Sequence, residues 1–162
     1  MEPRFESLKE IRLTGMKLPM SLADNKTAAL WSRFMPRRQE IKNKAGTELY
    51  SVQIYDPLYF DEFSPTREFE KWAAMPVNGH GEIPEGMEPL GIPGGEYAVF
   101  FYRGAASRGP EVFGYIFGEW LPKSGYLLDN RPHFEILGEK YKNEDPESEE
   151  EIWIPVRLKK LQ

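Results

Sequence analysis

The chain has 162 residues, with 21 lysines and arginines against 26 aspartates and glutamates, and a formal net charge of -5. Its length and its 40% hydrophobic content are those of a single globular domain with enough material for a substantial core. The acidic balance argues against nucleic-acid binding, which needs a concentrated surface of lysine and arginine. The chain contains no cysteine, which excludes disulfides and thiolate metal sites.

The amino terminus lacks the apolar run and the small-residue cleavage site of a secretory signal, and no stretch is apolar enough to span a bilayer. We therefore expect a cytoplasmic protein with neither a membrane nor a nucleic-acid partner. Aromatic residues make up 14% of the chain, which is more than a plain core needs. Such rings also suit the wall of a ligand pocket, because they bury a large area in few rotamers.

The first half of the chain predicts a strand, a helix and two further strands. Loose alternation of apolar residues predicts a strand over residues 5–20. An apolar stripe at helical spacing predicts a helix over residues 26–43, which Pro36 should kink or split. Clean alternation then predicts strands over residues 48–56 and 69–77.

The second half predicts the same order of elements. Residues 78–95 are dense in glycine and proline and predict a long irregular connection. A strongly apolar strand is expected over residues 95–104, and a helix over residues 108–125, with Pro110 suited to its first turn and Pro122 to its end. Two strands close the chain, FEILGEKY and EIWIPV, and the acidic run NEDPESEEE between them is predicted to be a solvated hairpin loop.

The two halves also match in detail. The segment YSVQIYD matches FEILGEK, and EKWAAMPV matches EIWIPVRL. In this alignment Trp72 and Trp153 occupy equivalent positions. The offset is about eighty residues throughout. This pattern predicts one domain built from a duplicated unit, whose copies span about residues 1–80 and 90–162 and share a core.

The most informative residue is Glu135. It stands between Phe134 and Ile136, and strand alternation directs its side chain away from both. If the opposite face meets a cavity, Glu135 is a buried negative charge that requires a cation or a proton. If that face meets water, Glu135 is an ordinary exposed strand residue.

Other chemistries find little support in the residues. His80 and His133 have no second ligand at a suitable spacing, so we expect no metal site. No G-x-S-x-G pattern marks a nucleophile, and the glycines at residues 91–95 precede a strand, which argues against a phosphate-binding loop. We expect no cofactor.

Three segments, GEYAVFFYRG, WLPKSGYLLDNRPHFEIL and EEEIWIPVRL, resemble the GyrI-like small-molecule-binding domain. This is also the effector-binding domain of some AraC-type and MerR-type transcription activators. The resemblance covers nearly the whole chain and implies an α+β fold: a duplicated strand-helix-strand-strand module with a curved antiparallel sheet, two main helices and a central pocket. Those regulators carry a helix-turn-helix ahead of this domain. Because the resemblance begins almost at Met1, we expect a free-standing effector-binding domain.

The resemblance also implies a site. The signature residue of the family is a glutamate on the strand after the second helix, at the floor of an aromatic-lined pocket that in several members receives lipophilic cations. The matching position here is Glu135. The candidate ligand-binding residues are Glu135, Trp72, Trp153, Trp120, Tyr97, Tyr55, Tyr141 and Phe117.

Three functions follow from this resemblance. The first is capture of a lipophilic, cationic small molecule, for sequestration or for sensing through a partner. The second is hydrolysis of cyclopropane-bearing electrophiles, as in some GyrI-like proteins, with Glu135 as general base and tryptophan and tyrosine neighbours positioning the reactive ring. The third is inhibition of DNA gyrase, for which no residue of this chain offers a surface.

Overall fold

The structure is a computed structural model that describes residues 1–79, 81–138 and 145–159. Within these ranges the strands form one antiparallel sheet in the order β1-β6-β9-β8-β3-β4-β2-β5, with β7 paired to β9. The strands are β1 (Arg4–Leu8), β2 (Ile11–Met20), β3 (Leu49–Ile54), β4 (Phe69–Pro76), β5 (Glu88–Ile92), β6 (Gly95–Arg103), β7 (Tyr126–Leu128), β8 (His133–Leu137) and β9 (Glu149–Leu158). The helical segments are α1 (Thr27–Phe34), the 3-10 segments η1 (Met35–Glu40) and η2 (Ala106–Arg108), α2 (Gly109–Tyr115), the π-helical turn η3 (Ile116–Trp120) and α3 (Leu121–Lys123).

The predicted α+β class is confirmed, with a large antiparallel sheet and two helical runs. The α-helical geometry of the first run ends at Phe34, and the chain continues as η1 through Pro36. Proline has no amide hydrogen and clashes with the preceding turn, which accounts for the change. In the second run Pro110 lies in the first turn of α2, where its missing N–H costs no hydrogen bond.

Three segments differ from the prediction. The amino-terminal strand is divided at Lys9 and Glu10 into β1, which pairs with β6, and β2, which pairs with β4 and β5. The connection predicted to be irregular contains β5, which lies at an end of the sheet. An edge strand tolerates proline, here Pro89. The short strand β7 was not predicted.

Strand pairing decides which side chains share a face of the sheet. Ala73, Ser51, Glu135, Ile152 and Phe100 lie opposite one another in a single row across β4, β3, β8, β9 and β6. At one end of this row Ala73 packs in the apolar cluster under α1, and at the other Phe100 and Ile152 pack in the cluster under α2. Both helical runs therefore cover the face that carries Glu135.

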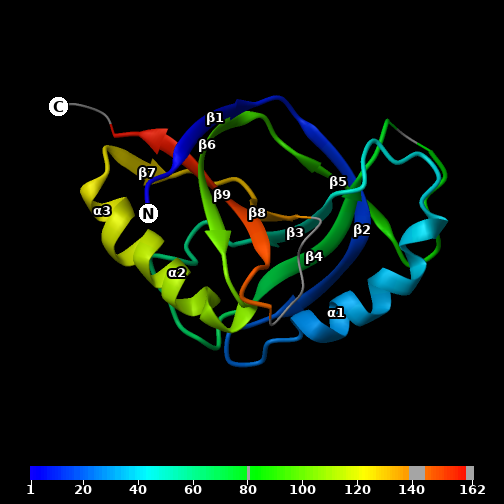
Figure 1. The fold of residues 1–162 in the computed structure, drawn as a ribbon, viewed down its shortest axis with the longest axis horizontal. Coiled ribbons are helices and arrows are strands. Elements are labelled where there is room, and N and C mark those ends of the chain that lie inside the picture. Colours follow the sequence, from blue (N-terminus) through cyan, green and yellow to red (C-terminus); the bar gives the residue numbers. More distant parts are fainter. Residues whose placement is uncertain (80, 139–144, 160–162) are drawn as a thin grey trace.

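The opposite face encloses a separate core. Figure 1 shows the sheet bent into an arch, with α1 and α2 along its outside. The side chains that point inside the arch form one apolar cluster, whose larger members are Tyr50, Val52, Trp72, Tyr97, Phe134 and Trp153. Partly buried residues pack against it, including Leu8 of β1, Ile11 of β2 and Leu90 of β5.

The order strand, helix, strand, strand occurs twice, as β2-α1-β3-β4 and as β6-α2-β8-β9. Val52 pairs with Trp72 just as Phe134 pairs with Trp153, and Val52 and Phe134 lie opposite each other. This register makes Gln53 the counterpart of Glu135. The sequence match between YSVQIYD and FEILGEK is displaced from it by two residues.

The two tryptophans also share a local interaction. Trp72 Nε1 donates a hydrogen bond to Glu70 Oε1 at 2.6 Å, and Trp153 Nε1 donates to Glu151 Oε1 at 3.2 Å. In each case the acceptor is the residue two positions earlier on the same strand and the same face. Both indole N–H groups are thereby satisfied.

Gly15 on β2 generates a stability prediction, because a Cβ there would meet the Ala73 carbonyl oxygen and would lie 2.6 Å from Ala74 Cα. We expect Gly15→Ala to lower the free energy of unfolding by about 1–3 kcal/mol, since the backbones of β2 and β4 must separate. Urea denaturation measures the change. The control is Gly114→Ala in α2, where nothing lies within 4 Å and alanine should stabilise the helix by about 0.5–1 kcal/mol. Equal stability of wild type and Gly15→Ala would contradict this close packing.

Candidate functional site

Glu135 is only 7% exposed. Gln53 Nε2 donates a hydrogen bond to Glu135 Oε1 at 3.0 Å, and Lys71 Nζ lies 3.9 Å from the same oxygen. Burial raises the pKa of the Glu135 carboxyl, while the Lys71 ammonium and the Gln53 amide act in the opposite direction. The carboxylate is thus removed from water, with one cation and one neutral donor beside it.

Lys71 and Glu150 complete a buried group of charges. Lys71 is 8% exposed, and its burial lowers the pKa of its ammonium group, against the attraction of Glu135 and Glu150. Glu150 is half-buried, and burial together with the charge of Glu135 raises its pKa to about 7. Strands β4 and β9 direct these two side chains to the face that carries Glu135.

The position of Glu150 corrects one expectation. The acidic run that ends at Glu151 was predicted to be a solvated hairpin loop, but Glu149 already belongs to β9. Once the chain pairs with β6 and β8, alternation places Glu150 on the face of Glu135 and Glu151 on the other. A run of like charges therefore crosses from solvent into the protein.

Aromatic rings border this charge cluster. His133 is buried on the same face of β8, two residues before Glu135, and burial lowers the pKa of its imidazole to about 3, so the ring is neutral. The Phe60 ring stacks on His133 at 5.6 Å and on Phe117 at 5.3 Å between centroids. Tyr55 meets His133 edge-on at 4.9 Å. Burial, and then the charge of Glu135, raises the pKa of the Tyr55 hydroxyl.

An open groove of about 510 Å³ reaches these rings. That volume lies within the range of roughly 300–1,000 Å³ typical of small-molecule sites. Its lining includes Tyr55, Phe60 and His133 together with the charged residues Asp56, Asp61, Asp129, Arg131, Arg157 and Lys159. Glu135 does not line the groove. It is, however, the next residue after His133 whose side chain points to the same face of β8.

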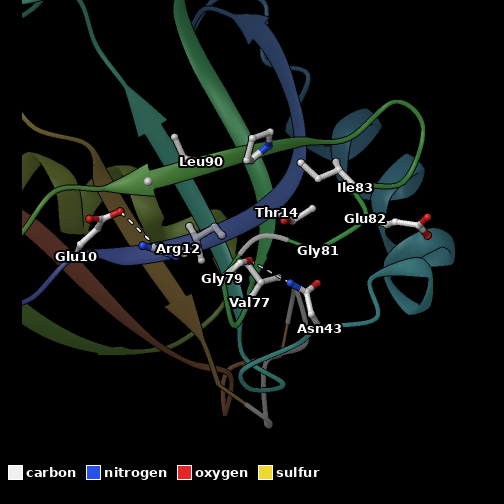
Figure 2. Close-up of a pocket in the computed structure, with 13 residues that line it drawn as sticks. Glu10, Arg12, Thr14, Asn43, Val77, Gly79, Gly81, Glu82, Ile83 and Leu90 are labelled. Carbon is white, nitrogen blue, oxygen red and sulfur yellow. Dashed lines mark hydrogen bonds and ion pairs between the residues drawn. The ribbon is translucent and has the colours of Figure 1, made fainter.

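A second, smaller cleft lies between β2, β5 and the connection after β4 (Figure 2). In it Arg12 pairs with Glu10 at 3.8 Å, and Asn43 donates a hydrogen bond to the Gly79 carbonyl oxygen at 3.1 Å. Its volume of about 120 Å³ admits a few water molecules but no drug-sized ligand. It shares no lining residue with the Glu135 cluster.

Of the predicted aromatic site residues, the structure brings Tyr55 and Phe117 to the Glu135 side. It does not bring Trp72, Trp153 or Tyr97 there, because all three point into the arch. Each is next in sequence to a residue of the Glu135 face, and strand alternation turns it away. These three predicted site residues therefore lie on the face of the sheet opposite to Glu135.

Two further candidates remain. Trp120 belongs to the apolar cluster under α2, where its ring meets Phe100 edge-on at 5.1 Å. Its position there is that of a core residue. Tyr141 lies outside the described residues.

Sequence reasoning missed Lys71, Gln53 and Glu150. For the first two a signal was present, since Lys71 precedes Trp72 and Gln53 follows Val52 in the same alternation that singled out Glu135. The side chains of Gln53 and Lys71 point away from the arch core because the adjacent Val52 and Trp72 point into it. For Glu150 the acidic run masked that signal.

The described part of the chain contains no group of three histidine, aspartate or glutamate side chains that could hold a metal ion. No helix in that same part is long and apolar enough to cross a membrane.

Comparison with known proteins agrees with this architecture. The model of one protein family, described as the GyrI-like small molecule binding domain, matches residues 1–157. The transcriptional regulator BrlR of Pseudomonas aeruginosa is 28% identical over 158 residues, which are 96% of this chain and 56% of the regulator. The chain thus spans about half the length of this curated relative.

Solved structures share the fold. The structure of SAV2435 bound to tetraphenylphosphonium superposes with a TM-score of 0.70 at 20% identity, over 97% of this chain and 94% of that one. The C-terminal domain of EcmrR gives a TM-score of 0.71 at 19% identity, over 97% and 98% of the two chains. With the family model covering residues 1–157, the chain belongs to the GyrI-like small molecule binding domain family.

Proposed function

We propose that the protein binds a lipophilic organic cation in a pocket whose anionic group is Glu135. The observation that carries this proposal is the burial of that carboxylate beside a ring-lined groove. A carboxylate without its hydration costs several kcal/mol, roughly, unless a cation or hydrogen-bond donors compensate for the lost water. A cationic ligand gains electrostatic attraction from this carboxylate, whereas a neutral ligand of the same shape does not.

The surrounding rings support the same class of ligand. Tyr55, Phe60, Phe117 and His133 offer aromatic surface at one end of the charge cluster. A well-placed ring attracts a cation by about 0.5–2 kcal/mol, and the apolar part of the ligand adds about 25 cal/mol for each Å² that it buries. That SAV2435 binds tetraphenylphosphonium shows that this fold can accept such a ligand.

Entry to Glu135 requires the ring layer to move. Tyr55 and Phe60 belong to the connection between β3 and β4, and Figure 1 shows this connection passing beside α2. In our proposal the ligand enters by the groove, displaces the Phe60 ring from His133 and Phe117, and takes its place. Phe60 is 37% exposed, so its ring is accessible from the groove, and the ligand must replace the ring contacts that Phe60 gives up.

The hydrolase alternative draws less support from the geometry. It expects tryptophans to hold a reactive ring against Glu135, and both Trp72 and Trp153 point to the opposite face. The glutamate that would act as base is also engaged by Gln53 and lies near Lys71. Turnover of a cyclopropanoid substrate by the purified protein, lost in Glu135→Gln, would reverse this order of preference.

The first prediction concerns the carboxylate. We expect Glu135→Gln to weaken the binding of tetraphenylphosphonium about tenfold or more, or ~1.4 kcal/mol, because the amide keeps the shape but loses the charge. Isothermal titration calorimetry measures the affinity. The matched control is Glu70→Gln on the Trp72 side of the sheet, which removes the same charge and should leave the affinity unchanged. Equal affinities of wild type and Glu135→Gln would exclude the proposed role.

The second prediction concerns the sign of the ligand's charge. Tetraphenylborate has the four-phenyl shape of tetraphenylphosphonium with the opposite charge. We expect it to bind at least about 100-fold more weakly, or ~2.7 kcal/mol, because the buried carboxylate repels it. The same calorimetric titration provides the comparison. If both ions bind alike, apolar burial alone drives recognition and the carboxylate has no part in it.

A further inference from the structure

Three ionisable side chains from three strands lie on the helix-covered face of the sheet, within reach of one another's charge: Lys71 on β4, Glu135 on β8 and Glu150 on β9. Lys71 Nζ lies 3.9 Å from Glu135 Oε1, and both residues are more than nine-tenths buried. The carboxylate proposed to receive a ligand cation therefore already has a cation of the protein beside it. This feature distinguishes the site from a plain anionic pocket.

We propose that Lys71 is the resident counter-ion of Glu135, and that a ligand cation takes its place with release of one proton from the cluster of Lys71, Glu135 and Glu150. This inference rests on the proposed function and adds to it the control of the same site by pH. Cations would be held in neutral or alkaline conditions and released in acid.

The net charge of the cluster determines whether a proton leaves when a cation binds. With Lys71 charged, Glu135 ionised and Glu150 protonated, the cluster is neutral. Addition of a ligand cation would leave one unbalanced positive charge away from water, which is strongly unfavourable. Loss of one proton, from the Glu150 carboxyl or from the Lys71 ammonium, restores neutrality.

The environment of both groups favours that loss. Glu150, with its pKa raised to about 7 by burial and by Glu135, holds a proton below pH 7 that it can surrender when a cation arrives. Burial lowers the pKa of the Lys71 ammonium, which also makes loss of its proton easier. Above pH 7 Glu150 is already ionised, the cluster carries a net charge of -1, and a cation enters without proton release. Affinity should therefore rise with pH up to about 7 and then level off.

The other described groups around Glu135 do not titrate in this range. Gln53 on β3 is uncharged. Tyr55, just past β3, has its pKa raised and remains a neutral phenol. His133 on β8 has its pKa lowered to about 3 and remains a neutral imidazole. From the helical run after β6, the side chain that reaches His133 is the uncharged ring of Phe117.

The test is calorimetry of tetraphenylphosphonium binding to the wild-type protein, in pairs of buffers that differ in ionisation enthalpy. We expect close to one proton released per bound cation at pH 6 and close to none at pH 8.5. Between pH 5.5 and 6.5 the affinity should rise up to about tenfold per pH unit. Because no substitution is involved, this measurement does not depend on the folding of a variant.

Two variants assign the effect to its residues. At pH 8 we expect Lys71→Met to bind the cation about tenfold more tightly, because no resident cation competes for Glu135. Lys17→Met is the matched control, since the Lys17 ammonium lies over the Trp72 ring on the opposite face and should leave the affinity unchanged. Glu150→Gln should bind more weakly at pH 8, because its cluster cannot reach a net charge of -1 without deprotonating Lys71. Thermal melting verifies that each variant is folded.

The outcomes separate the inference from the function on which it rests. Saturable binding whose affinity does not change between pH 5.5 and 8.5, without proton release, would overturn the inference and leave cation binding intact. A Lys71→Met protein that melts cooperatively and yet binds more weakly at pH 8 would also overturn it. Absence of any binding by the wild-type protein at pH 8 would instead remove the proposed function.

Discussion

The interaction on which this structure depends is the balance of one negative charge away from water. Glu135 lies on a central strand, under a face that two helical runs cover, so its carboxylate receives compensation only from nearby side chains. The Gln53 amide supplies it from the neighbouring strand β3, and the Lys71 ammonium from β4, the next strand beyond β3. A buried ion pair of this kind adds little to stability compared with apolar packing of the same volume. Its place in the middle of the sheet therefore supports the proposed binding role more than a role in stability.

The two faces of the sheet divide the tasks. The face inside the arch is filled by rings and aliphatic side chains, with Trp72 and Trp153 held in place by bonds to their own strands. This side supplies the apolar burial that stabilises the domain. The other face has apolar clusters beneath α1 and α2, and a small third cluster of Met20, Tyr59 and Phe69. The charged residues Lys71, Glu135 and Glu150 lie on this face, and the rings of Tyr55, Phe60, Phe117 and His133 lie beside them.

The repeated order of elements places Gln53 and Glu135 at equivalent positions. The two modules meet at β3 and β8, and the register places Gln53 in one module where the other has Glu135. The amide and the carboxylate hydrogen-bond each other across this junction. A symmetric pair of glutamates would repel each other at such a distance, and a symmetric pair of glutamines would offer no charge. The difference between the two modules at this one position creates a single anionic site.

The sequence by itself determined those properties that depend on neighbouring residues along the chain. Alternation in FEILGEKY directed Glu135 away from Phe134, Pro36 ended the first helix, and three quoted segments carried the family resemblance. Only the tertiary structure decided what Glu135 meets. Lys71 and Glu150 are 64 residues before and 15 residues after it, and they reach it because β4, β3, β8 and β9 are neighbours in one sheet. The same strand pairing places the side chains of Trp72 and Trp153 on the face opposite to Glu135. Strand periodicity is local, whereas strand order and register result from the packing of the whole chain, so a charge and its partner can be recognised together only in the folded protein.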